Sequence, residues 1–286
     1  PTAASSGHEP APGGGPHHDP RVKIWGHGAG SASRSEGGVV ELLGVGVPRD
    51  DGGWLLHRVC ARIASGTVTV VVSQRQEERL ALLDAVAGRR IPEEGGVWVA
   101  GMPVRADNLR RLRARVGEVD LGLPLVEGRS VLWNTLAAAH PGLRILQGLF
   151  HLPRPRERQA ARRALAALGF DDSSHDPVSN VPHEGRARLV TARELLRRPE
   201  WLVIREVDTV LGLADAEAFL GRLRRLVRAE RVSVVASAAG PAVARGVADR
   251  VMAIAEGLLV FDGPPDLFTE DGVGWRLRQP LGAGGR

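Results

Sequence analysis

The residues that could do chemistry gather in one short stretch, SQRQEER, at positions 73–79. It follows the β-branched run 68–72, which predicts a buried strand. Apolar residues at helical spacing come next and stop at a glycine, namely Leu80, Leu82, Leu83, Val86 and Gly88. Strand, turn and helix form the frame of a phosphate-binding loop, in which glycine backbone N–H groups and a lysine hold the phosphates. The frame is present here, but the stretch contains neither glycine nor lysine and carries two arginines and two glutamates.

Composition narrows the class of protein. The 286 residues are 43% hydrophobic and 25% charged, which is enough to bury a large core in one or two domains. The net charge of +5 comes almost wholly from arginine, with Lys23 as the single lysine. Because the arginines are interleaved with Asp and Glu, we expect no nucleic-acid binding. Cys60 is the only cysteine, so neither an internal disulfide nor a Cys-based zinc site is expected, and no apolar run is long enough to span a membrane.

Three regions of different character follow one another along the chain. Residues 1–38 are rich in Gly, Pro, Ser and His, lack hydrophobic periodicity and are predicted to be a disordered tail. A folded domain is expected over 39–286. Within it, 124–185 has helical spacing only, which predicts a helical insertion. Elsewhere parallel strands alternate with helices, and this implies an α/β core whose sheet is covered on both faces.

Hydrophobic spacing also predicts the individual elements. Strands are expected at 39–43, 54–63, 67–72, 116–119, 201–204, 232–236, 251–254 and 258–261. A hairpin with a glycine turn is expected over 93–104. Helices are expected after the 73–79 turn, to about 88, and at 109–115, 131–139, 143–150, 156–168, 186–197, 214–229 and 241–248.

This order of elements, with several sequence fragments, resembles the ATP-binding cassette of ABC transporters over about 39–268. The fragments are GTVTVVV and LLDAVAG around the turn, RVGEVD, ARELLRRPEWLVI, VSVVAS, ADRVMAI and GLLVFDGPPDLFT. The segment RERQAARRALAALGF and the ending FDGPP look most like the phosphonate-import branch. The resemblance implies an α/β, P-loop NTPase-like cassette with a mostly parallel sheet core, a β-rich edge and a helical subdomain at about 121–197.

The resemblance also assigns the phosphate-loop positions, and these are degenerate here. Ser73 and Glu78 stand at the two glycine positions, and Arg79 stands at the lysine. The Mg²⁺-binding hydroxyl is replaced by Leu80, and a second glutamate, Glu77, adds negative charge that would oppose a polyphosphate. We interpret the loop's arginines as a solvated helix start paired to these acids. The loop's candidate nucleotide-binding residues are Ser73, Arg75, Gln76, Arg79, Leu80 and Ala81.

Other family positions are carried over in the same way. Leu121 stands at the position of the glutamine that senses the γ-phosphate. Arg205 stands at the position of the aspartate that orients Mg²⁺, and Ala239 stands at the position of the switch histidine. The catalytic glutamate is retained as Glu206, which we interpret as a leftover carboxylate without a task. Arg49 is the residue nearest to the position of the aromatic that stacks on adenine, and Trp54 could take its place. Gly212 stands where the family has an aspartate after the second phosphate-site strand. The signature motif reads Val181, Pro182, His183, Glu184 and Gly185.

Loss at functional positions beside an apparently intact scaffold favours a catalytically dead ABC-family subunit, a pseudo-ATPase that is a structural or regulatory partner of a transporter. No cofactor and no metal are then expected. The alternative is an active ATPase, using ATP and Mg²⁺, that energises import of phosphonate or a similar small anion. A third interpretation is a decayed or altered copy without a cellular role.

The resemblance carries expectations about partners and place as well. It implies a transmembrane permease subunit, which residues near 121–133 would face, and a second cassette in a homodimer or heterodimer. It implies a cytoplasmic location, peripheral at the inner face of the cell membrane. Nucleic acid is not among the expected partners.

Overall fold

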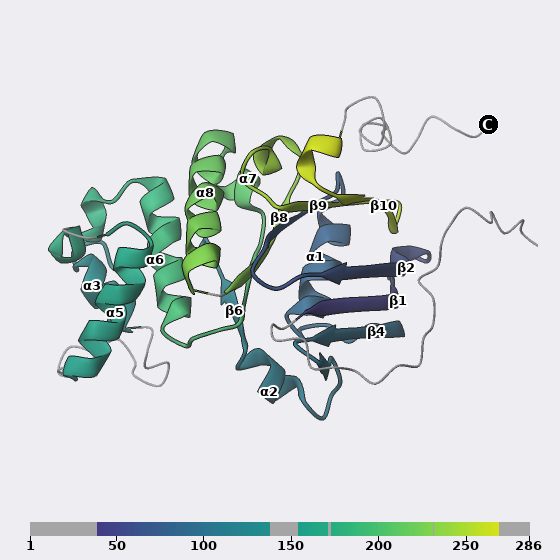
Figure 1. Ribbon diagram of the computed structural model, residues 1–286, viewed down its shortest axis with the longest axis horizontal. Coiled ribbons are helices and arrows are strands. Elements are labelled where there is room, and N and C mark those ends of the chain that lie inside the picture. The colour runs from purple at the N-terminus through teal and green to yellow at the C-terminus, as the bar shows by residue number, and fades with distance from the viewer. Residues whose placement is uncertain (1–38, 138–153, 171–172, 231, 269–286) are drawn as a thin grey trace, which may run out of the picture. The chain divides into compact units, whose positions relative to one another are not determined.

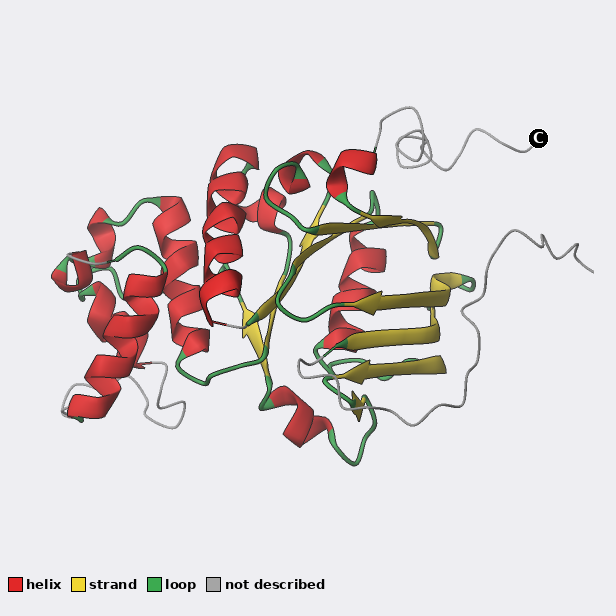
Figure 2. Ribbon diagram, in the orientation of Figure 1, coloured by secondary structure: helices red, strands yellow, loops and turns green. Residues whose placement is uncertain are grey.

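The computed structural model describes residues 39–137, 154–170, 173–230 and 232–268 (Figures 1 and 2). Its strands form two sheets, one of order β2-β1-β4-β5 and one of order β10-β9-β3-β8-β7-β6. The strands are β1 (Val40–Pro48), β2 (Trp54–Ile63), β3 (Val68–Val72), β4 (Glu94–Val99), β5 (Met102–Pro103), β6 (Val116–Val119), β7 (Trp201–Ile204), β8 (Ser233–Ala238), β9 (Arg250–Ala255) and β10 (Leu258–Gly263).

The described helices begin and end as follows. The α-helices are α1 (Gln76–Val86), α2 (Leu109–Arg113), α3 (Val131–Ala137), α5 (Pro155–Ala167), α6 (His183–Leu195), α7 (Val207–Leu211) and α8 (Leu213–Glu230). Short 3₁₀ turns are η1 (Ser173–His175), η2 (Val178–Asn180), η3 (Ala242–Ala244) and η4 (Pro265–Leu267). None of the described helices combines the length and apolar character that a membrane crossing requires.

The larger sheet carries the site, and its central strand β3 is buried on both faces. β3 pairs in parallel with β8 and β9, and only the edge strand β10 is antiparallel. Alternate β3 residues enter different cores, as strand geometry requires. Val70 lies in the core that includes α6 and α8, whereas Val71 lies in the core that includes α1, β1 and β2. The predicted α/β class, with a sheet covered on both faces, is therefore confirmed.

The smaller sheet and the helical segment flank this core. β1 pairs antiparallel with β2 and β4, and β4 continues into β5 through a tight turn that contains Gly101, as the predicted hairpin requires. In the described part of 124–185, the helices α3 and α5 pack with each other and with α6, and the only strand-like pairing is the isolated bridge between Ser130 and Pro177. The expectation of helices without strands in that segment is confirmed for its described residues.

Several predicted boundaries were wrong. The helix expected at 241–248 is only the turn η3, because the backbone is extended at Arg245 (φ −64°, ψ 128°) and left-handed at Gly246 (φ +72°). β1 continues five residues beyond the predicted end at 43, through Gly44 at φ +61°. α6 begins at His183 instead of 186, and α7 was not predicted. The tail 1–38 and the helix expected at 143–150 lie outside the described residues.

Candidate functional site

The stretch between β3 and α1 is shorter than its sequence pattern predicts. Helix α1 already begins at Gln76, so only Ser73, Gln74 and Arg75 connect strand to helix. No side chain caps the helix, and its first turn carries Glu77 and Glu78. Carboxylates are favoured at a helix N-terminus because the free N–H groups and the helix dipole give it partial positive charge. The chain therefore supplies its own anions at the helix end where such loops bind phosphate.

Glu78 is the anion that lies inside the protein. Its side chain has no exposed surface, and it accepts hydrogen bonds from Ser73 Oγ at 2.6 Å and from the Gly257 N–H at 3.1 Å. Arg75 Nη1 lies 3.8 Å from its Oε1, with one third of the arginine side chain exposed. The prediction that Arg75 pairs with an acid of this turn is confirmed. Glu78 itself, however, is a buried structural carboxylate.

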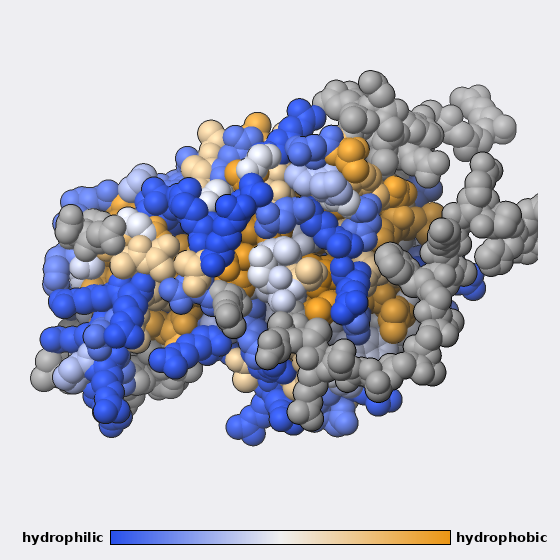
Figure 3. Space-filling view, in the orientation of Figure 1, coloured by the Kyte–Doolittle hydropathy of each residue, from blue (hydrophilic) through white to orange (hydrophobic). Residues whose placement is uncertain are grey.

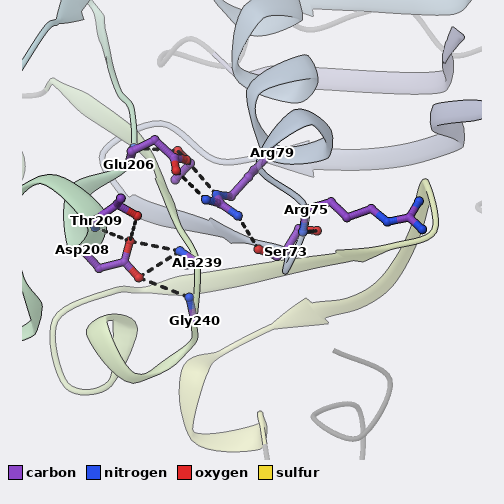
Figure 4. Close-up of polar contacts among 9 residues, drawn as sticks. Ser73, Arg75, Arg79, Glu206, Asp208, Thr209, Ala239 and Gly240 are labelled. Carbon is purple, nitrogen blue, oxygen red and sulfur yellow. Dashed lines mark hydrogen bonds and ion pairs between the residues drawn. The ribbon is translucent and has the colours of Figure 1, made fainter. Parts of the chain in front are cut away.

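Arg79, at the position of the family lysine, points across the site to Glu206 (Figure 4). Its Nε donates to Glu206 Oε1 at 2.7 Å, its Nη2 donates to Oε2, and its Nη1 donates to the Ser73 carbonyl at 2.6 Å. Only 4% of the Arg79 side chain is exposed. The interpretation of Arg79 as part of a solvated helix start was wrong, because a bidentate partner compensates for the cost of burying its charge.

Glu206 is fixed from three directions. It adopts a left-handed conformation, φ 56° and ψ 46°, at the start of α7. Its N–H donates to Ser237 Oγ at 2.9 Å, and the same hydroxyl donates to Oε1 at 3.0 Å. Both carboxylate oxygens therefore have hydrogen-bond donors, so a role as general base would first require release of Arg79. The idea that Glu206 has no task was wrong in one respect, since it is the counter-ion of a buried arginine.

Arg205, the neighbour of Glu206, turns away from this pair. Its Nη1 donates to Glu118 at 2.9 Å and its Nη2 donates to Asp84 at 2.7 Å, which connects β7 to β6 and α1. Burial by itself lowers the pKa of Arg205, but hydrogen bonds and charge attraction from the two acids outweigh it and raise the pKa above its ordinary value. The positive charge at the family's metal-orienting position is thus neutralised by two acids of this chain.

A half-buried carboxylate, that of Asp208, holds the loop after β8. The Asp208 carboxylate accepts from the Ala239 N–H at 2.9 and 3.0 Å and from the Gly240 N–H at 3.2 Å (Figure 4). Ala239, at the switch-histidine position, thereby contributes its backbone instead of a side chain. Sequence reasoning missed both Asp208 and Ser237. Their spacing in the sequence does not indicate these roles, because the contacts of Ser237 with Glu206 and of Asp208 with Ala239 each join positions 31 residues apart.

The signature positions form a separate network at the start of α6. Glu184 Oε2 lies 2.9 Å from Arg188 Nε, and Glu184 Oε1 lies 3.6 Å from Arg222 Nε on α8. Arg188 also donates to the Leu168 carbonyl at 2.9 Å and lies 4.7 Å above the Phe170 ring. Its burial lowers its pKa, partly offset by attraction to Glu184. This helix start therefore also carries its own carboxylate.

The remaining signature residues surround this network without joining it. Val181 is buried, Pro182 precedes the first helical turn, and His183 is exposed. A side chain at Gly185 would meet Val181 Cγ1 at 2.6 Å, so the glycine has a packing role. Among the described residues, no hydrogen bond or ion pair joins these positions directly to the Arg79–Glu206 pair.

The other predicted site residues lie apart from the pair. Trp54 stacks on His57, with ring centroids 5.1 Å apart. Arg49 faces Asp51 at 3.6 Å. Leu121 packs against the larger core. Gln76 is exposed, Leu80 is half-buried and Ala81 is buried. Within the described residues, no group of three or more His, Cys, Asp or Glu could hold a metal ion.

Known proteins provide an independent comparison. The chain is 31% identical over 218 residues to a phosphonates import ATP-binding protein of Pseudomonas putida, covering 75% of this chain and 81% of that protein. It is 28% identical over 210 residues to the corresponding protein of Thiobacillus denitrificans, covering 73% and 81%. In structure it is similar to cbiO1 of Clostridium perfringens, part of an ABC transporter complex, with a TM-score of 0.69 and 19% identity over 83% of this chain and 95% of that one. No protein-family model matches.

Proposed function

Because the chain belongs to the phosphonate-import ATP-binding proteins, which are ABC transporter cassettes, we propose that it is a cassette subunit that does not hydrolyse ATP. The observation that carries this proposal is the buried pair of Arg79 and Glu206. The residue at the lysine position and the residue at the catalytic-glutamate position neutralise each other. Neither charge is then available to a phosphate or to an attacking water.

The donor set around this pair does not fit Mg-ATP. Glu78 would repel a phosphate at the start of α1, and Leu80 has no hydroxyl for Mg²⁺. Arg205 is positive where a metal would need an oxygen ligand, and it is already neutralised by Asp84 and Glu118.

The pairing of the replaced residues supports a folded subunit with a structural or regulatory role. A decayed copy would be expected to leave introduced charges without partners, yet Arg79, Arg205 and Glu184 each have opposite charges within 4 Å. In this proposal the subunit is peripheral at the inner face of the cell membrane and works with a transmembrane permease and a second cassette. The surface that includes 121–133 faces the permease, and the helical subdomain covers about 121–197.

An active ATPase remains the second candidate, because relatives named as phosphonates import ATP-binding proteins cover most of this chain. ATP hydrolysis by the purified full-length chain with Mg²⁺, alone and with the permease, separates the two. The pseudo-ATPase proposal predicts no turnover above the protein-free rate in either setting. Turnover that Glu206→Gln abolishes would overturn it. An active enzyme further predicts that Arg79→Ala abolishes the activity.

A further inference from the structure

A surface that the nucleotide site does not use lies on α5. Four arginines of this helix, Arg156, Arg158, Arg162 and Arg163, are all exposed, and we call them the α5 arginine face. Their side chains make no hydrogen bond or ion pair within the described residues. Figure 3 shows hydrophilic side chains gathered over the part of the molecule where Figure 1 places α5.

The helix is oriented so that this face must point to solvent. Ala161 and Leu165 are fully buried in the larger core, and α5 packs on α3 and α6. The one acid of the helix, Glu157, is at its first turn, where its carboxylate accepts from the Arg154 N–H at 2.9 Å. Its carboxylate therefore lies at the N-terminus of the helix, beside the first turn.

The arrangement is unfavourable for the isolated protein. Arg158 and Arg162 are four residues apart, and like charges at this spacing destabilise a helix. Some other arginines at the surface have acid partners, as Arg186 has in Glu127 at 2.7 and 2.8 Å. Four arginines on one helix, without an acid partner among the described residues, form a site for an anionic surface, since clusters of four to eight Lys or Arg on an amphipathic helix bind anionic lipids.

The composition of the face distinguishes a lipid surface from a protein partner. Protein interfaces centre on apolar or aromatic anchors. The exposed large hydrophobic residues of the described chain all lie elsewhere, at Leu43, Ile91, Val126, Val210, Leu213, Leu258 and Leu267. We propose that the α5 arginine face binds the anionic phospholipid headgroups of the membrane. The inference goes beyond the proposed function and is independent of whether nucleotide binds.

Vesicle co-sedimentation of the full-length protein tests this proposal. The protein is expected to bind vesicles of phosphatidylglycerol and phosphatidylcholine, not vesicles of phosphatidylcholine alone, and to be released by high salt. Replacing Arg156, Arg158 and Arg162 together by glutamine should lower the partition coefficient by roughly 10- to 100-fold. Circular dichroism of the variant checks that the helices remain.

The matched control removes the same charge from α2 and the loop before it. Arg105, Arg110 and Arg111 are exposed, and their side chains make no hydrogen bond or ion pair among the described residues. The triple glutamine variant at these positions should bind vesicles within about 3-fold of the unchanged protein. An equal loss of vesicle binding in both variants would mean that binding depends on the net charge and not on α5, and this would overturn the proposal. Binding to polyglutamate without binding to the anionic vesicles would assign the face to an acidic protein and would also overturn it.

Discussion

The N-termini of α1 and α6 both hold a carboxylate of the chain itself, but the partners of the two carboxylates differ. Each is a helix N-terminus that binds phosphate in cassettes, and each here carries a glutamate in its first turn. At α1, Glu78 is fully buried and depends on a hydroxyl and a backbone N–H. At α6, Glu184 is 13% exposed and lies between two arginines. Removing the deeper carboxylate leaves buried donors without an acceptor, so its loss should lower the free energy of unfolding more.

The difference extends to what each helix start is connected to. Next to Glu78, Arg79 ties α1 to the ends of β7 and β8 through Glu206 and Ser237. Among the described residues, Glu184 joins α6 to α8 and to its own next turn. The first network joins α1 to two strands of the larger sheet, whereas the second joins α6 to α8. This comparison sets the expected order of the mutational effects.

The largest effect is expected from breaking the Arg79–Glu206 pair. Glu206→Ala leaves a buried guanidinium without its counter-ion and should lower the free energy of unfolding by about 3–5 kcal/mol, measured by urea titration. The double variant Arg79→Met with Glu206→Leu should recover much of this loss, because an apolar pair removes both desolvation costs.

The control for that experiment is an exposed bidentate pair of similar geometry. Arg186 and Glu127 have side chains that are 35% and 52% exposed. Glu127→Ala should cost at most about 1 kcal/mol, since exposed ion pairs are screened by water. Similar losses for Glu127→Ala and Glu206→Ala would show that burial does not determine the value of the pair.

An intermediate effect is expected at Glu78. Glu78→Gln places an amide nitrogen or a weaker acceptor opposite Ser73 and Gly257, and should lower the free energy of unfolding by about 1–3 kcal/mol. Glu77 in the same turn is exposed, and Glu77→Gln should change it by no more than about 0.5 kcal/mol. Equal values for the two would mean that only the helix dipole matters, not the buried contacts.

The smallest effect is expected at the start of α6. Glu184→Gln weakens the acceptor shared by Arg188 and Arg222, and should cost about 1 kcal/mol in the same titration. His183→Gln, one residue earlier and exposed, serves as the control and should be near neutral. A cost at Glu184 larger than that at Glu78 would reverse the comparison between the two helix starts.

Local spacing was enough to predict the α/β class and most of the elements, but not the site. The strand before Ser73 and the leucines after Arg79 follow regular periodicities, and their elements were predicted from them. The partner of Arg79 is 127 residues away, so no local pattern could show that its charge is buried. The same holds for Arg205, whose acids are 87 and 121 residues away. The left-handed backbone at Glu206, which directs α7, has no signal in a non-glycine residue.

The most direct test of the central claim is calorimetric titration of the purified full-length protein with ATP in the presence of Mg²⁺. If Arg79 and Glu206 satisfy each other, no saturable heat is expected up to millimolar ATP, and ATP should not raise the midpoint of thermal unfolding. Micromolar affinity accompanied by thermal stabilisation, and weakened by Arg79→Ala, would contradict the account. It would mean that nucleotide displaces the internal pair and that the site binds what its relatives bind.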